Sequence, residues 1–212
     1  MYMKNFGKIF FFLVAVACSN SLFSQAFGVR AGLNLANMTA KDSDDSYDDD
    51  NEMLIGLNLG VSASFEISSG LMFETGLGLS QKGYKISEGG FTGTYRTNYL
   101  DIPLTVKKMF AGDKIFVQAG PYLGFGISGK SKYKFDGETE DEPIDWGSDK
   151  DDDDQKRLDF GLTFGAGAMV TEKIQVGLNY GLGLANVSPY SENGYKATNN
   201  VIGITVGYSL AK

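Results

Sequence analysis

The sequence contains no histidine. Catalytic triads and zinc sites that depend on histidine are therefore excluded. The single cysteine, Cys18, lies near the beginning of the chain, and no spacing of serine and carboxylate residues marks a nucleophile. We predict no catalytic residue and no cofactor, and we do not expect an enzyme.

Seven charged residues lie in segments that otherwise alternate between apolar and small residues, namely Arg30, Glu66, Glu74, Lys82, Asp101, Lys107 and Asp159. If these side chains share one interior, they must be paired or hydrated, because an isolated buried charge is costly. The sequence therefore predicts an internal ion-pair network. Lys82, Asp101 and Asp159 are expected nearer one end of it, and the other four nearer the opposite end.

Most of the remaining acidic residues are concentrated in residues 37–53 and 130–157. Asp44, Asp48 and Asp50 are the candidates for a metal site, although the glycine turn and closing glutamate of a calcium loop are missing. Solvated acidic loops are the alternative interpretation. A second hypothesis is that calcium or magnesium links these loops to anionic lipid.

Eight segments that could position these side chains alternate between apolar residues and glycine, serine, threonine or asparagine. A period of two is typical of a β-strand whose two faces meet different environments. The predicted strands cover residues 27–36, 55–67, 71–80, 100–107, 115–128, 158–167, 174–184 and 202–210.

The glycine-rich face indicates what kind of sheet these strands form. Glycine fits the narrow interior of an eight-stranded barrel, whereas a soluble sheet usually exposes larger polar residues. The apolar residues would then face lipid. We predict an all-β fold, an eight-stranded antiparallel up-and-down transmembrane β-barrel of the outer-membrane type. A soluble lipocalin-like carrier is the alternative.

Short and long connections alternate along the chain. Residues 68–70, 111–114 and 171–173 form short links, and residues 37–53, 85–95, 130–157 and 188–199 form long ones. Outer-membrane barrels have short periplasmic turns and longer external loops. We therefore predict a location in the outer membrane, with both termini in the periplasm and the long loops outside the cell.

The N-terminal residues are typical of an export signal. Lys4 and Lys8 precede an apolar run at residues 9–17 that is too short to span a bilayer as a helix. We predict a signal peptide at residues 1–24, cut between Ser24 and Gln25, and a barrel domain over residues 25–212. A lipoprotein signal at Cys18 is the alternative, although the usual leucine three positions before the cysteine is absent.

Several short phrases resemble one known family. They are residues 28–34 (GVRAGLN), 80–83 (SQKG), 98–104 (NYLDIPL) and 119–124 (AGPYLG). Together they resemble the PorT-family outer-membrane barrels of Bacteroidetes over nearly the whole chain after the signal. The resemblance implies an outer-membrane barrel and, from the founding member, assistance to a secretion system for surface proteins. The C-terminus departs from many such barrels because Leu210, rather than an aromatic residue, ends the last strand.

Two prolines of these phrases lie inside predicted strands, where a residue without an N–H needs an explanation. If the turn at residues 111–114 sets the register, Pro103 lies opposite Tyr122 with both side chains inward. We expect the two rings to pack together and a local bulge to compensate for the missing bond. We assign Pro103, Pro121 and Tyr122 a structural role.

Two classes of function remain open. The first is a structural or secretion-accessory barrel whose lumen is plugged by side chains, and the second is a surface-exposed binding protein or adhesin that acts through its acidic loops. A narrow channel is a further alternative. Trp146, the only tryptophan, would either anchor a partner or pack against the barrel mouth.

The expected partners follow from location and charge. They are outer membrane lipid, the barrel assembly machinery, and secretion-system or surface proteins. Nucleic acid is not expected, because acidic residues outnumber basic ones by 26 to 19 and form no basic stripe. We expect a monomer.

Overall fold

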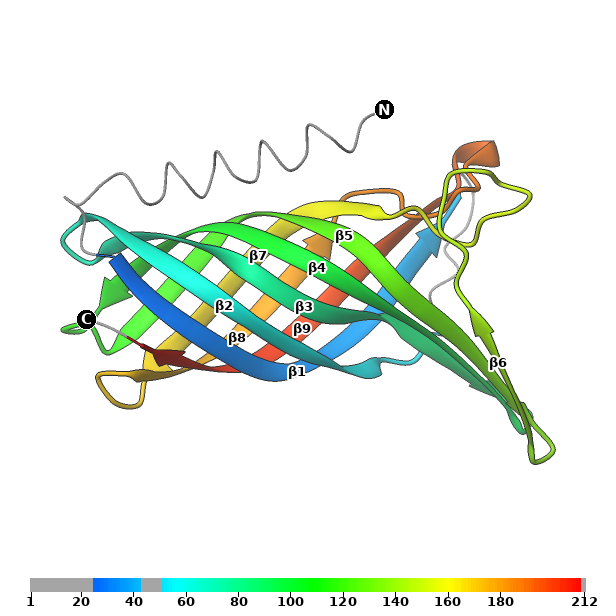
Figure 1. Ribbon diagram of the computed structural model, residues 1–212, viewed down its shortest axis with the longest axis horizontal. Helices are drawn as coiled ribbons and strands as arrows, with labels where there is room; N and C mark the ends of the chain where they lie inside the picture. Colours follow the sequence, from blue (N-terminus) through cyan, green and yellow to red (C-terminus); the bar gives the residue numbers. More distant parts are fainter. Residues whose placement is uncertain (1–24, 43–50, 211–212) are drawn as a thin grey trace.

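Nine strands and one short helix form the described part of the chain, residues 25–42 and 51–210, in a computed structural model (Figure 1). The strands are β1 (Gln25–Lys41), β2 (Leu54–Ser68), β3 (Leu71–Glu88), β4 (Phe91–Phe110), β5 (Ile115–Phe135), β6 (Glu138–Pro143), β7 (Leu158–Met169), β8 (Ile174–Gly183) and β9 (Lys196–Ser209), and the 3-10 helix η1 is Glu192–Gly194. Within these residues, no helix has the length and apolar character needed to cross a bilayer.

Eight of these strands close into a ring. Their order is β1-β2-β3-β4-β5-β7-β8-β9, each antiparallel to its neighbours, and β1 pairs with both β2 and β9. The short strand β6 pairs with β5 outside this ring. The predicted eight-stranded antiparallel barrel is therefore confirmed, with one extra strand that the alternation did not predict.

The two faces of the ring differ as the alternation predicted. Leu59 and Leu178 on the outer face are 48% and 56% exposed, whereas Asn34 and Asp159 on the inner face are fully buried. Apolar side chains thus form the outside of the barrel and polar side chains its inside. A soluble carrier with an apolar interior would have the reverse arrangement.

The connections distinguish the two ends of the barrel. The links at residues 69–70, 111–114 and 170–173 lie at one end, together with the start of β1 and the end of β9 (Figure 1). We call this the turn end. The opposite end, which carries the remaining links and η1, is the loop end.

Three strands continue beyond the barrel at the loop end, which corrects the predicted loop at residues 85–95. β3 and β4 run on to a two-residue turn at Gly89 and Gly90, whose positive φ angles of 54° and 87° suit glycine. Tyr84 stacks on Tyr95 across this hairpin, with ring centroids 5.5 Å apart. Cross-strand aromatic pairs of this kind stabilise the two strands beyond the end of the barrel.

The predicted loop at residues 130–157 is also partly strand, because β5 extends to Phe135 and turns back into β6. We use the name sheet extension for residues 83–88 of β3, 91–96 of β4 and 129–135 of β5 together with β6. Figure 1 shows it leaning away from the barrel axis at the loop end.

The two prolines interrupt the ladders without changing their register. Pro103 lies opposite Tyr122 and both are buried, which confirms the predicted pairing. The predicted bulge at this point is wrong. The β3–β4 ladder omits only Ile102 and Pro103, the β4–β5 ladder omits only the pairs at Gly120 and Pro121, and the register resumes unchanged beyond each gap. Each missing N–H thus affects one ladder locally, and the register shift lies elsewhere, between Asn98 and Tyr99.

Candidate functional site

Lys82 is the centre of a buried charge cluster in the half of the lumen nearer the loop end. Its Nζ lies 2.9 Å from Asp159 and 3.1 Å from Asp101. The same ammonium lies over the rings of Tyr99 and Tyr122, at 4.7 and 4.6 Å from their centroids. Two carboxylates and two aromatic faces therefore stabilise one cation that is only 2% exposed.

Asp159 joins three parts of the barrel in this cluster. It accepts hydrogen bonds from Lys82 of β3, from Asn199 of β9 at 3.1 Å and from the Tyr122 hydroxyl of β5 at 3.4 Å. A buried carboxylate with several donors is well compensated for its lost hydration. The cluster therefore links β3, β5 and β9 to Asp159, the first inward residue of β7.

A second ion pair fills the lumen nearer the turn end. Lys107 Nζ lies 3.1 Å from Glu74 Oε2 and donates to Gln175 Oε1 at 2.8 Å. Ser64 donates a further hydrogen bond to Glu74, and the ammonium lies 4.2 Å from the centroid of Phe116. Strands β2, β3, β4, β5 and β8 all contribute to this layer.

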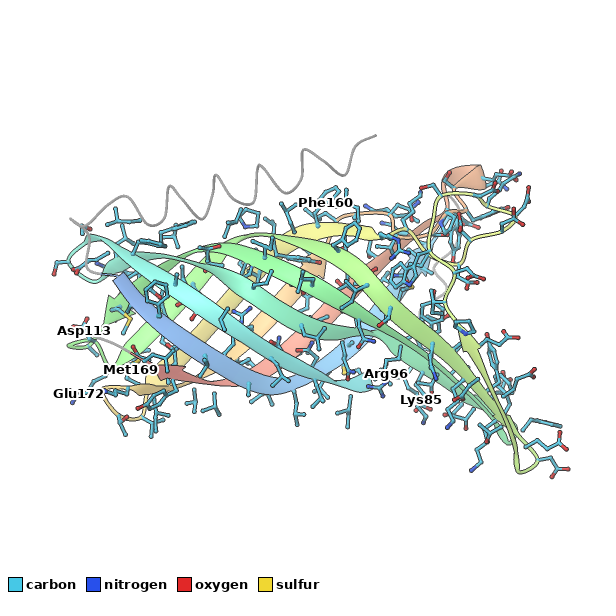
Figure 2. The ribbon with its side chains drawn as sticks, in the orientation of Figure 1. Lys85, Arg96, Asp113, Phe160, Met169 and Glu172 are labelled. Atoms are coloured by element: carbon cyan, nitrogen blue, oxygen red, sulfur yellow. The ribbon has the colours of Figure 1, made fainter. Side chains whose placement is uncertain are left out.

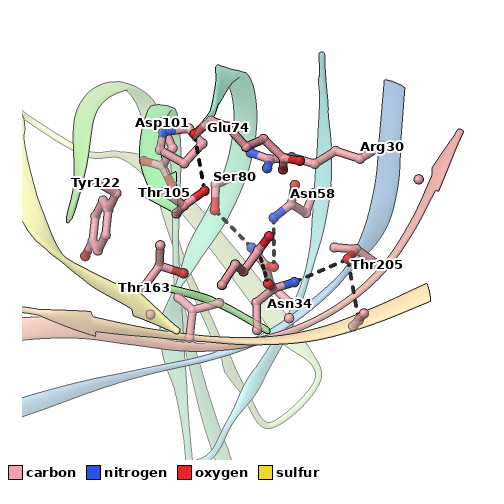
Figure 3. A pocket seen from close by; sticks show the side chains of 18 of the residues that line it. Arg30, Asn34, Asn58, Glu74, Ser80, Asp101, Thr105, Tyr122, Thr163 and Thr205 are labelled. Carbon is pink, nitrogen blue, oxygen red and sulfur yellow. Dashed lines mark hydrogen bonds between the residues drawn. The ribbon is translucent and has the colours of Figure 1, made fainter. Parts of the chain in front are cut away.

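A polar cavity of about 120 Å³ lies between the two charge layers (Figure 3). Asn34 donates to Ser80 at 3.0 Å, and Gln118 donates to Asn179 at 2.8 Å. Arg30 extends from β1 to this cavity, against Gly60 and Gly78, and its buried Nε has no hydrogen-bond partner. Amides, hydroxyls and the Arg30 guanidinium thus line the cavity, together with Glu74, Lys82 and Asp101 from the two charge layers.

Six of the seven charges predicted for the interior line the lumen, five of them in the two layers and Arg30 at the cavity between the layers. Arg30, Lys82 and Lys107 balance Glu74, Asp101 and Asp159, three charges against three. Glu66 lies apart from them as an exposed residue next to the register shift at the end of β2. The alternation did not reveal that the last inward position of this strand lies at the open rim.

Trp146 covers the loop end of the lumen. Its indole lies directly on Gly126 of β5, so closely that a Cβ at that position would overlap the ring. The indole also meets Tyr99 edge-on at 5.7 Å and lies 5.5 Å from the Arg157 guanidinium. Of the two predicted arrangements, the structure has the tryptophan packed against the barrel mouth.

Neighbouring contacts hold this cover in place. Gln155 donates to the Tyr99 hydroxyl at 2.6 Å, and Ile144 packs on Gly129. Lys150 reaches η1, where its Nζ lies 2.6 Å from Glu192. This bond raises the pKa of Lys150 and lowers the pKa of Glu192, so the link is present at neutral pH and is lost as the pH falls through the lowered pKa of Glu192.

A small apolar cluster lies beside the cover, formed by Met38, Ala40, Ala185, Val187 and Ala197. Tyr84 and Tyr95 of the sheet extension pack against it. The extension is therefore anchored to β1 and β9 as well as to its own strands.

The inner face of the sheet extension carries aromatic and acidic side chains. Tyr133 and Phe135 are exposed there, and Tyr133 stacks on Phe91 at 6.1 Å. The β6 residues that pair with this side of β5 are Glu138, Glu140 and Glu142. Exposed aromatic residues are enriched in protein-binding surfaces, and the three glutamates add negative charge to this one.

Sequence reasoning missed several residues of the site. Tyr99 could have been found, because it shares the inward alternation of Asp101 and Pro103. Gln155 and the aromatic face of the extension lie in segments without usable periodicity, so no local signal marked them.

The candidate metal ligands and the predicted signal peptide cannot be placed. Asp44, Asp48 and Asp50, like residues 1–24, lie outside the described residues. In residues 25–42 and 51–210 no group of three or more acidic, cysteine or histidine side chains could hold a metal ion.

Comparisons with known proteins agree with this architecture. The model of the family described as outer membrane protein beta-barrel domain matches residues 23–188. No curated protein sequence matches the chain significantly.

Three of the solved structures to which the chain is similar are the following. Neisserial surface protein A is 14% identical, with a TM-score of 0.47, covering 87% of this chain and 98% of its own. The attachment invasion locus protein of Yersinia pestis is 14% identical, with a TM-score of 0.42 and coverages of 87% and 99%. The outer membrane protein OprG from Pseudomonas aeruginosa is 13% identical, with a TM-score of 0.40 and coverages of 90% and 98%.

The Lys82 cluster predicts a large stability effect. Replacing Lys82 with Met leaves two buried carboxylates without their cation, which typically costs about 3–5 kcal/mol. We expect the free energy of unfolding, measured by urea titration of the folded barrel, to fall by an amount in this range. The triple variant Lys82→Met/Asp101→Asn/Asp159→Asn should recover most of the loss.

Lys150→Met is the matched control, because it breaks an ion pair between exposed side chains. It should leave the unfolding midpoint almost unchanged. Equal losses for Lys82→Met and Lys150→Met would contradict the structural importance of the buried cluster.

The contact between Gly126 and Trp146 predicts a fluorescence change. In Gly126→Ala the new methyl group overlaps the indole, so Trp146 must leave the mouth and its emission should shift to longer wavelength. Gly181→Ala is the control inside the same lumen, because the nearest atom to its added Cβ is 3.8 Å away. An unchanged spectrum for Gly126→Ala would show that the cover does not rest on this glycine.

Proposed function

Because this chain belongs to the outer membrane protein beta-barrel domain family, we propose that it is a closed, non-conducting barrel of the outer membrane that binds other proteins through its sheet extension. The observation that carries this proposal is the contrast between the two parts of the molecule. The lumen is filled by side chains at successive levels, whereas the extension presents exposed aromatic residues beyond the barrel.

Three features support a lumen that does not conduct. The Lys107–Glu74 pair, the Lys82 cluster and the Trp146 cover follow one another from the turn end to the loop end. An eight-stranded barrel has an interior just wide enough for side chains to fill. Opening a path would require separating buried charge pairs, which is costly.

The orientation in the membrane is part of the proposal. Short turns face the periplasm in outer-membrane barrels, and longer connections face the outside. The turn end would therefore lie in the periplasm, together with the start of β1 and the end of β9. The sheet extension and the Trp146 cover would lie outside the cell.

The inner face of the extension has a composition suited to a protein partner. Tyr133 and Phe135 offer rigid aromatic surface, which often supplies most of the binding energy in protein interfaces. Glu138, Glu140 and Glu142 on the same face favour a basic partner through charge complementarity. We therefore propose that the bound proteins are basic.

A secretion-accessory role is the second candidate. The phrases that resemble PorT-family barrels at residues 98–104 and 119–124 lie in β4 and β5, which carry the Lys82 cluster and the base of the extension. In that role the same face would hold a surface protein during its export. The two candidate functions differ in the process that fails when the inner face of the extension is altered: adhesion fails under the first and export under the second.

The binding proposal is tested with the double variant Tyr133→Ser/Phe135→Ser. Loss of two aromatic contacts should weaken the binding of protein-displaying cells to an immobilised basic protein, such as lysozyme, by about tenfold or more. Immobilised acidic albumin serves as the charge control. The amount of surface protein exported by the same cells is measured in parallel.

The outcomes separate the candidates. Weaker adhesion with normal export supports surface binding, and defective export with normal adhesion supports the accessory role. A variant that leaves both unchanged would contradict a functional role of this face. Glu172→Gln at the turn end is a control that should affect neither measurement.

The closed lumen makes a separate prediction. In planar lipid bilayers the wild-type protein should give no steady unitary currents under conditions in which an open porin conducts. Regular current steps from the purified wild-type barrel would refute the plugged lumen without bearing on the binding face.

A further inference from the structure

The outer face of the sheet extension carries a row of cations. Lys130, Lys132 and Lys134 alternate along β5 with Ser131, which is buried on the inner side. Directly opposite them on β4 lie Arg96, Thr94 and Thr92. Lys85 continues the row on β3, where it pairs with Thr94.

Among residues 25–42 and 51–210, little negative charge opposes this row. On the same side of the sheet, Asp141 lies 4.0 Å from Lys132, and Glu52 lies 2.8 Å from Lys85. Within the described part of the chain, Lys130 and Lys134 form no ion pair. The other β6 acids pair with inner-face residues of β5, so the two faces of one sheet carry opposite charge.

The cationic face is continuous with the apolar outside of the barrel. Phe125 and Ile127, which precede it on β5, are 50% and 46% exposed on the outer side. Lys130 follows Ile127 by three residues, a distance of about 10 Å along a strand. The change from apolar to cationic side chains therefore occurs at the end of the lipid-facing band.

The same change occurs on the strands that close the barrel. Lys41 of β1 pairs with Lys196 of β9, and this pair lies on the loop-end side of the outward apolar pair Leu35 and Ile202 in the same ladder. Met38 and Ala197 are buried on the inner side, which places the two lysines outward. Outward cations thus lie beyond the apolar band on at least two sides of the loop end.

We propose that the outer face of the sheet extension docks on the phosphate-bearing headgroups of outer-leaflet lipid. The extension leans away from the barrel axis, and Lys85 and Arg96 lie at its base (Figures 1 and 2). Lysines near an anionic lipid surface each contribute about fivefold in affinity, and their long stems can follow the apolar boundary. The docked face would hold the aromatic inner face away from the membrane.

This inference rests on the proposed orientation but not on the protein-binding role. It also differs from the hypothesis of metal-bridged acidic loops, because here lysines contact the phosphates directly. The chain as a whole carries a net charge of −7, so general attraction to anionic lipid is not expected. Selectivity for anionic lipid must therefore come from the local face.

The test measures lipid selectivity beside the extension. The full-length protein, with Cys18→Ser and a fluorescent donor attached at Ser87→Cys on the outer face, is placed in phosphatidylcholine nanodiscs. Energy transfer is compared for acyl-labelled phosphatidylglycerol and acyl-labelled phosphatidylcholine. We expect severalfold enrichment of phosphatidylglycerol near the donor, and less enrichment at high salt because the charges are screened.

The variant Lys130→Gln/Lys132→Gln/Lys134→Gln should bring the ratio of the two lipids close to one. Lys108→Gln/Lys114→Gln/Lys173→Gln, with the same change in net charge near the turn end, should retain the enrichment. Gel mobility of unboiled samples verifies that each variant is folded. Lys130→Gln/Lys134→Gln is the milder replacement, because neither lysine forms an ion pair with a described residue.

Equal enrichment in the wild-type protein and in the outer-face variant would overturn the proposal and assign the face to another occupant, such as an acidic protein. The nanodisc presents the same lipid on both sides, and the experiment measures neither adhesion nor export. A failure here is therefore distinguishable from a failure of the protein-binding proposal. If the outer-face variant loses lipid selectivity while the wild-type protein retains it, the proposal is supported, whatever the adhesion measurements on the inner face show.

Discussion

Closure of the sheet by the β1–β9 ladder is the constraint on which the rest of the molecule depends. In hydrocarbon no water can satisfy an exposed backbone edge, so a sheet must close on itself. Closure with eight strands leaves a narrow interior. Large inward side chains are then possible only opposite small ones, as Phe116 lies against Gly167 and Tyr122 against Gly161. The glycines of the inner face therefore leave the space that the few large lumen side chains require.

The narrow lumen also explains why its charges are paired as they are. Side chains from opposite walls meet across it, so Lys82 of β3 reaches Asp159 of β7 and Lys107 of β4 reaches Gln175 of β8. Such contacts tie together strands that are not neighbours in the ring. Because the interior is used for these contacts, little of it remains for transport, and the exposed chemistry of the molecule lies at the loop end.

The alternation predicted the parts of the structure that repeat, namely the eight barrel strands and their outward face, and the turn at residues 111–114 predicted the pairing of Pro103 with Tyr122. It failed where the repeat ends. Residues 85–95 contain polar and glycine residues typical of a loop, yet tertiary contacts through Tyr84 and Tyr95 keep them in strands. Trp146 belongs to the site through contacts with Gly126 and Tyr99, which are distant in sequence, so no local pattern could assign it.

A single extra residue in β5 determines which way the sheet extension presents its chemistry. Asn98 pairs with Ser128, but Tyr99 pairs with Gly126, so Ile127 is the additional residue of a bulge. Before it the outward residues of β5 are odd-numbered, and after it they are even-numbered, because a shift of one residue exchanges the two faces of a strand.

Without this bulge Lys130, Lys132 and Lys134 would continue the lumen side, and Tyr133 and Phe135 would continue the apolar outside. The cations would then crowd the Trp146 cover, and the two aromatics would simply lengthen the lipid-facing band. The bulge is also where Gly126 receives the indole and where its N–H and carbonyl bond to Arg157. One local irregularity therefore both closes the lumen and gives the extension its two chemically different faces.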